Sequence, residues 1–172
     1  MGFTGRDKVL SVHADDVGIT QSSIDAFLEL LDFGTISCGS AMVPAPWFPE
    51  VARKFRENSE LDLGLHLTLN CEYVSYRWRP VSTISQESGF IDENGYFKQD
   101  KQEVMQTADP QSVEKEIDAQ LRVALNLGLK PTHVDSHSGT LWSEKYIDSY
   151  IKFYKNIRSC LYYLTQKRMI IQ

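Results

Sequence analysis

The chain has 172 residues, of which 42% are hydrophobic, and this length and composition suit one globular domain with a sizeable core. Its formal net charge is -5, and Lys and Arg occur in no block longer than a pair. These numbers argue against nucleic acid or an anionic membrane as a partner and favour a small-molecule ligand. We therefore expect residues 1–172 to form a single domain.

Cysteine usage and the N-terminal sequence bear on the cellular compartment. Cys38, Cys71 and Cys160 are odd in number, widely spaced and free of any C-x-x-C pattern, which argues against a disulfide framework and a cysteine-based zinc site. The N-terminal MGFTGRDK lacks the apolar stretch of a signal peptide, and no apolar run approaches the roughly 20 residues of a membrane span. We expect a cytoplasmic protein with free thiols.

The first sixty residues alternate between strand and helix patterns. Residues 8–12, KVLSV, predict a short β-strand that is closed by ADDVG. Residues 20–34 carry an apolar stripe at helical spacing and predict a helix that stops at a glycine. Residues 35–45 predict a second strand, and residues 46–60 a second helix with Pro49 in its first turn.

A long polar segment interrupts this alternation after the third strand. Residues 61–70, LDLGLHLTLN, are apolar at most positions, as expected for a strand that is covered on both faces. Residues 71–109 are polar, aromatic and rich in turn residues, and they are longer than a normal connection. We expect this segment to be an inserted lid or binding loop.

Two further β/α patterns complete the chain's regular part. Residues 109–128 predict a helix, residues 130–140 a fourth strand, and residues 143–157 a helix that begins at Ser143. Repeated β/α units imply a parallel sheet with right-handed crossovers. The predicted fold class is therefore α/β, either half of an eight-stranded barrel or a small open sheet.

Chemically active side chains follow three of the predicted strands. They are Asp15 and Asp16, then His66, then Asp135 and His137. The carboxyl ends of parallel strands meet at one rim, and all four histidines of the chain lie in these three segments. Imidazole and carboxylate together suit a divalent transition metal and leave positions open for water and substrate.

The adjacent carboxylates of Asp15 and Asp16 also point to a cation. Two neighbouring carboxylates raise each other's cost of ionisation unless a positive group compensates them. With Asp16 on a metal, Asp15 can stay ionised as the base that deprotonates a metal-bound water.

Each motif also has a purely structural interpretation. Asp15 and Asp16 can cap the following helix, His66 can be a core histidine bonded to a backbone carbonyl, and HVDSH can be a hydrogen-bonded strand end. Together these interpretations require three coincidences at one rim. The metal site is the simpler hypothesis.

Three motifs, HADDVG, GLHLTL and PTHVDSH, resemble in order and spacing those of the YdjC-like carbohydrate deacetylase family. The resemblance implies a parallel (β/α) barrel-like fold related to polysaccharide deacetylases. It also implies a metal-dependent hydrolase that removes the N-acetyl group from acetylated chito-oligosaccharides or related amino sugars. Carried over by position, Asp16, His66 and His137 are ligands of one divalent ion, Mg²⁺ or Zn²⁺, and Asp15 is the catalytic base.

Other residues near these motifs receive supporting roles. His133 and Asp135 share a strand face with His137, and His13 stands where the family usually has Asn. Aromatic side chains either stack on sugar rings or pack locally. These candidates are Tyr73, Tyr76, Trp78 and Trp142.

The C-terminal sequence departs from the family pattern. After about Asn156 the chain reads IRSCLYYLTQKRMIIQ, without the Gly/Pro stop and the strand that the pattern predicts. We therefore expect only about the first four or five β/α units, through truncation or a frame disruption. An open sheet edge would favour a homo-oligomer.

Two other functions remain open. One is a catalytically impaired carbohydrate- or metal-binding relative that lacks the C-terminal half. A phosphodiesterase ranks lower, because no glycine-rich phosphate loop and no Arg/Lys cluster lies near the motifs.

Overall fold

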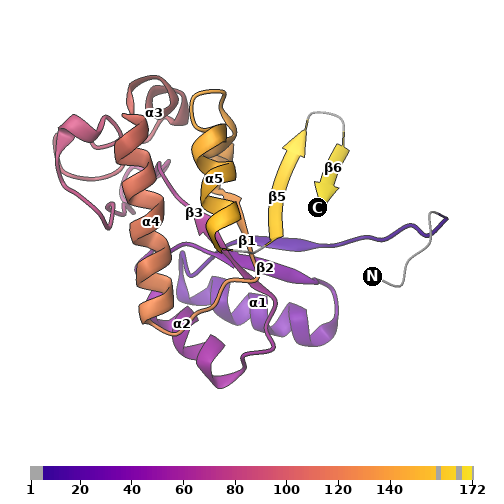
Figure 1. The fold of residues 1–172 in the computed structure, drawn as a ribbon. Coiled ribbons are helices and arrows are strands. Elements are labelled where there is room, and N and C mark those ends of the chain that lie inside the picture. Colours follow the sequence, from indigo (N-terminus) through magenta and orange to yellow (C-terminus); the bar gives the residue numbers. More distant parts are fainter. Residues whose placement is uncertain (1–5, 158–159, 166–167, 172) are drawn as a thin grey trace.

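A computed structural model describes residues 6–157, 160–165 and 168–171 as a sheet flanked by helices (Figure 1). The strands follow one another in chain order across the sheet, with parallel pairing from the first to the fifth and an antiparallel sixth. The predicted α/β fold with a parallel sheet is confirmed. The strands are β1 His13–Val17, β2 Cys38–Ala41, β3 Leu63–Leu67, β4 His133–Ser136, β5 Cys160–Thr165 and β6 Arg168–Ile171.

Helices cover the sheet in two groups. In Figure 1, α1 and α2 lie along one stretch of the sheet, and α4 and α5 pack against each other along another. The α-helices are α1 Gln21–Phe33, α2 Phe48–Glu57, α3 Lys101–Thr107, α4 Pro110–Asn126 and α5 Ile147–Ile157. The 3₁₀ helices are η1 Gln86–Ser88 and η2 His137–Trp142.

Local capping explains why α1 begins and ends where it does. The Thr20 hydroxyl accepts from the Ser23 backbone N–H at 3.2 Å, and Ser23 reaches back to the backbone N–H of Thr20. Gly34 ends the helix in the left-handed region at φ 82°, which glycine adopts without steric cost. Ile24 and Phe27 on the inner face are buried, as their helical spacing predicts.

The first strand starts later than the sequence pattern predicts. Residues 8–12 are not a strand, and Leu10 is 82% exposed. The first strand is instead β1, whose backbone pairs with β2 from His13 opposite Cys38 onward. Pairing with a neighbour, rather than apolar composition, therefore sets the strand's position.

Two predictions near the C-terminus are also wrong. The last helix, α5, begins at Ile147 rather than at Ser143, because residues 144–146 form a turn in which the Tyr146 N–H donates to the Ser143 carbonyl at 3.0 Å. Residues 160–165, for which no strand was predicted, form β5 and pair in parallel with β4. Tyrosine and threonine, which favour strands, make up half of that segment.

The long segment 71–109 is more ordered than a simple loop. It contains η1, an antiparallel bridge between Ile91 and Phe97, and the unpredicted helix α3. Asp100 caps α3 by accepting from the Gln102 N–H at 2.8 Å. That a lid function resides here stays a prediction.

Two buried polar side chains of α4 hold this segment and β3 in place. The Glu116 carboxylate accepts from the backbone N–H groups of Val81 at 3.1 Å and Ser82 at 2.9 Å. Gln120 bonds both backbone groups of Thr68, just beyond β3, at 3.1 and 2.7 Å. Because both side chains are fully buried, these bonds satisfy groups that water cannot reach.

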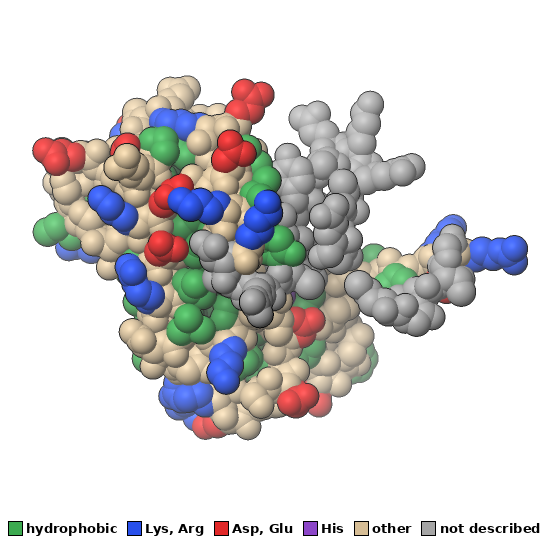
Figure 2. Space-filling view, viewed as in Figure 1, with side chains coloured by type: hydrophobic (Ala, Val, Ile, Leu, Met, Phe, Trp, Pro, Cys, Tyr) green, Lys and Arg blue, Asp and Glu red, His purple; other side chains and the backbone are tan. Residues whose placement is uncertain are grey.

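The outer surface carries both signs of charge. Figure 2 shows Lys and Arg interspersed with Asp and Glu over α4 and α5. The face in that view offers no continuous basic stripe of the kind that nucleic-acid phosphates bind. In the described part of the chain, no helix combines the length and apolar character needed to cross a bilayer.

Replacing Glu116 should loosen the 71–109 segment. We expect Glu116→Ala to lower the free energy of unfolding by about 1–3 kcal/mol, because two backbone N–H groups lose their acceptor. Urea denaturation measures the change. Asp118→Ala, on the exposed face of the same helix, is the control and should cost no more than about 0.5 kcal/mol. Equal effects of the two substitutions would contradict this account.

Candidate metal centre

Three side chains predicted as ligands converge at the carboxyl ends of β1, β3 and β4. The Asp16 Oδ1 lies 3.2 Å from His66 Nε2 and 3.0 Å from His137 Nδ1. One donor atom from each residue lies within 4.8 Å of the other two. The two histidine rings meet edge to face, with centroids 5.3 Å apart. The site is therefore built from three separate β/α units.

An unusual backbone conformation separates the two adjacent carboxylates. Asp16 has φ 59°, in the left-handed region that non-glycine residues seldom occupy. This turn aims Asp16 at His66 and His137, whereas the Asp15 carboxylate contacts His13 Nδ1 at 2.7 Å. The neighbouring charges thus face different imidazoles.

A buried network fixes the His66 ring from behind. Its Nδ1 contacts Asp135 Oδ1 at 2.7 Å, and the Ser40 hydroxyl donates to Asp135 Oδ2 at 2.9 Å. All three side chains are buried. A carboxylate behind a histidine fixes the ring's tautomer and orientation, which leaves Nε2 to face Asp16. The structure places Asp135 where a supporting residue would act.

Glu72, which no sequence motif indicated, lies beside His137. Its Oε2 is 2.9 Å from His137 Nε2, so His137 has a carboxylate on each ring nitrogen. The buried Trp78 ring packs edge-on against the same imidazole, with centroids 6.0 Å apart. Glu72 stands at the start of the 71–109 segment, and no periodic pattern marks it.

Proton counting shows that this cluster needs additional positive charge. A neutral imidazole carries one N–H, yet both nitrogens of His66 and of His137 face carboxylate oxygens. Either both rings are protonated, or a cation lies between them and Asp16. A donor set of two imidazoles and one carboxylate fits one divalent metal ion.

The electrostatics of the cluster agree with this count. Burial lowers the pKa of His66, but Asp135 and Asp16 outweigh it and raise that pKa to about 10. Burial likewise opposes protonation of His137, while its bonds to Asp16 and Glu72 raise its pKa. Burial raises the pKa of Asp16, yet hydrogen bonds from both histidines hold it far below its usual range.

The remaining predicted residues lie around the cluster in different ways. His13 Nε2 and His133 Nε2 are 2.8 Å apart. Trp142 is half-buried at the end of η2, which begins at His137. Trp78 is buried, whereas Tyr73 and Tyr76 beside it are 45% and 38% exposed.

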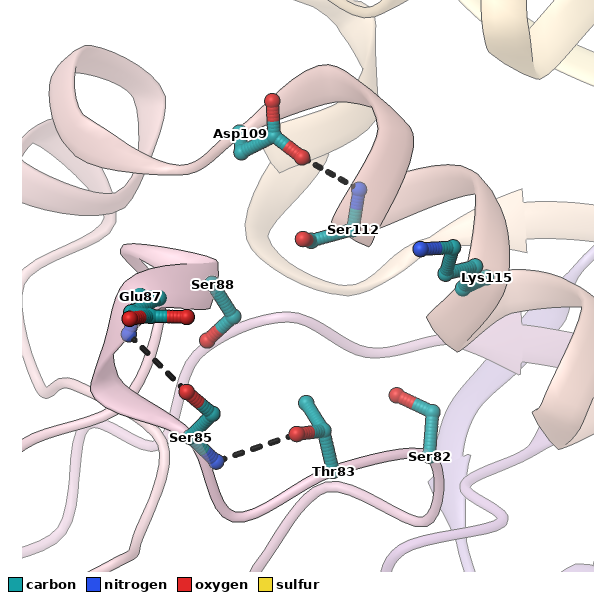
Figure 3. A pocket seen from close by; sticks show the side chains of 8 residues that line it. All are labelled: Ser82, Thr83, Ser85, Glu87, Ser88, Asp109, Ser112 and Lys115. Atoms are coloured by element: carbon teal, nitrogen blue, oxygen red, sulfur yellow. Dashed lines mark hydrogen bonds between the residues drawn. The ribbon is translucent and has the colours of Figure 1, made fainter.

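A polar pocket of about 330 Å³ lies between the 71–109 segment and the start of α4 (Figure 3). It shares no residue with the cluster of Asp16, His66 and His137. Several of its polar groups cap local backbone: Asp109 accepts from the Ser112 N–H at 2.8 Å, and Ser85 accepts from the Glu87 N–H at 3.3 Å. We assign this pocket no role in the site.

The carboxylates beside His66 should be detectable as a raised pKa of its imidazole. In metal-free protein we expect NMR to give His66 a pKa near 10, and Asp135→Asn to move it toward the ordinary value of about 6.5. Because the folded-state pKa is the higher one, the charged ring stabilises the fold fully below about pH 6.5 and loses this effect as pH rises toward 10.

Asp118→Asn, on exposed helix surface, is the control and should leave the His66 titration unchanged. A His66 ring that titrates near 6.5 in the unaltered chain would contradict the geometry described above.

The sequence is similar to one protein family and to proteins that share one name. The sequence model of the family described as YdjC-like protein matches residues 9–168. A carbohydrate deacetylase of Thermus thermophilus is 32% identical over 152 residues, which cover 88% of this chain and 52% of that protein. A carbohydrate deacetylase of Thermoanaerobacter pseudethanolicus is 30% identical, with coverage of 84% and 56%. The chain thus spans about half the length of these curated relatives.

A solved structure has the same fold. It is the crystal structure of an Enterococcus faecalis V583 protein described as a candidate cellobiose-phosphate cleavage protein. The TM-score is 0.81 at 23% identity, and the match covers 91% of this chain and 59% of the other. At this identity the likeness concerns the fold alone.

Proposed function

This chain belongs to the family of YdjC-like proteins, and from that premise we propose that it is a metal-dependent hydrolase that removes N-acetyl groups from acetylated chito-oligosaccharides or related amino sugars. The observation that carries the proposal is the convergence of Asp16, His66 and His137, with Asp15 next in sequence to the first of them. Relatives named carbohydrate deacetylase support the class of substrate.

The proposed ligands are Asp16, His66 and His137. When bound there, a divalent cation supplies a Lewis acid for the acetamide carbonyl and lowers the pKa of water. The two imidazoles and the carboxylate suit Zn²⁺, and the family resemblance also admits Mg²⁺. Asp135 and Ser40 keep His66 in the orientation that presents Nε2.

We assign Asp15 the role of general base. Its side chain is 63% exposed and so can reach water and substrate. The hydrogen bond from His13 is the main cause that lowers the pKa of Asp15, so the carboxylate is ionised at neutral pH. It would accept a proton from the attacking water, and His13 would hold it in place.

The substrate would approach beside the aromatic cluster of Tyr73, Tyr76 and Trp78. Trp78 is buried and its indole N–H donates to the Asn70 carbonyl at 3.0 Å, so its role is packing. Tyr76 donates to the Ile19 carbonyl, which joins the cluster to the turn after β1. Tyr73 is the most exposed of the three rings, and we propose that it stacks on a sugar.

The experiment measures acetate release from N,N'-diacetylchitobiose by the purified chain. We expect release with added Zn²⁺ or Mg²⁺ and its loss with a chelator. Asp15→Asn should lower kcat at least about 100-fold, the usual contribution of a general base, while metal binding stays intact. Asp118→Asn is the matched control and should retain full activity.

The alternative role, a binding-only relative, predicts a different result. Stoichiometric metal binding that His66→Ala abolishes, without acetate release under any condition, would overturn the hydrolase proposal and support binding alone. Release that persists after complete removal of metal would overturn the metal dependence.

A further inference from the structure

We infer that His13, Cys38 and His133 form a second metal site, suited to Zn²⁺, in the interior of the curved sheet. These residues come from β1, β2 and β4, and one donor atom of each lies within 4.8 Å of the other two. None of the three is a ligand in the proposed hydrolase, so the site does not depend on that function, although His13 also contacts the proposed base Asp15. The cysteine spacing argued against a cysteine-based zinc site, and here Cys38 is one ligand beside two histidines.

The three side chains meet because of the strand register. His13 and Cys38 are backbone partners in the parallel pairing of β1 with β2. His133, from a strand two places beyond β2, brings its Nε2 to 2.8 Å from the His13 Nε2. Cys38 is 1% exposed and His133 is 1% exposed, so the site is shielded from bulk water.

The hydrogen bonds behind the two imidazoles fix their tautomers. His13 Nδ1 contacts the Asp15 carboxylate at 2.7 Å, so this nitrogen carries the proton. The Thr132 hydroxyl donates its proton to Asp62 at 2.5 Å, so its oxygen accepts from His133 Nδ1 at 2.9 Å. Each Nδ1 is a donor, and each Nε2 of a neutral ring is therefore an acceptor.

Two acceptor nitrogens cannot lie 2.8 Å apart without a positive group between them. An extra proton or a metal cation would satisfy both. Two observations favour the metal. Cys38 adds a soft third donor, and each imidazole has an oxygen partner behind it, as metal-bound histidines do.

The fold also leaves space for His133 at this point. A Cβ atom on Gly64 would lie 2.3 Å from His133 Cδ2 and 2.4 Å from its Nε2. Only glycine therefore allows the imidazole to lie across β3 and reach His13.

The thiolate distinguishes this site from the candidate metal centre, which contains none. The test titrates the chelator-treated chain with Co²⁺ as a spectroscopic probe. We expect two equivalents to bind, together with a near-ultraviolet thiolate-to-cobalt charge-transfer band. Cys38→Ser should remove the band and one equivalent. Cys71→Ser, at a buried free thiol outside the cluster, is the matched control and should keep both.

Two more variants separate the sites and guard against misfolding. His66→Ala should lose the other equivalent and keep the charge-transfer band. His13→Asn, at a less buried ligand than Cys38, should weaken the band at unchanged circular dichroism. Co²⁺ binding without a thiolate band, or a band that survives Cys38→Ser, would overturn the inference. The former result would leave a shared proton between His13 and His133.

Discussion

Pairing of imidazole with carboxylate inside the sheet is the interaction on which the rest of this structure depends. His66, His137 and Asp135 are buried, and a buried charge is costly unless a partner compensates it. The carboxylates that contact His66 of β3 come from two other strands, Asp16 from β1 and Asp135 from β4. Ser40 of β2 donates a hydrogen bond to Asp135. The strands must therefore keep their register for the polar interior to be satisfied, and the apolar side chains pack with the helices.

Local patterns predicted much of the fold. Helical spacing predicted α1, α2 and α4. Apolar periodicity, Pro49 at the start of α2 and Gly34 at the end of α1 each act on residues close by in the sequence, so a single sequence reveals them. The start of β1 was wrong, because pairing with β2 decides it, and a strand's partner is not written in its own composition. Helix α3 was not predicted, because its seven residues are too few to show a helical pattern of apolar side chains.

The candidate site was predictable only in part. Parallel strand ends made it possible to expect Asp16, His66 and His137 at one rim, and the structure brings them together. Glu72 could not be expected, because the path of an irregular segment places it. The approach of His13 to His133 was equally hidden, since it depends on how far the sheet curls.

That curl has a mechanical consequence. Three strand spacings separate β1 from β4, about 14 Å in a flat sheet. Yet the side-chain pairs His13–His133 and Asp16–His137 join β1 to β4 and to the first residue of η2, just beyond β4. The two pairs contact β1 at positions three residues apart. One such contact would hold β1 and β4 together at a single point, whereas two contacts at different positions also limit how the two strands tilt against each other. Polar side chains inside the curved sheet thus help to set how tightly the sheet curves.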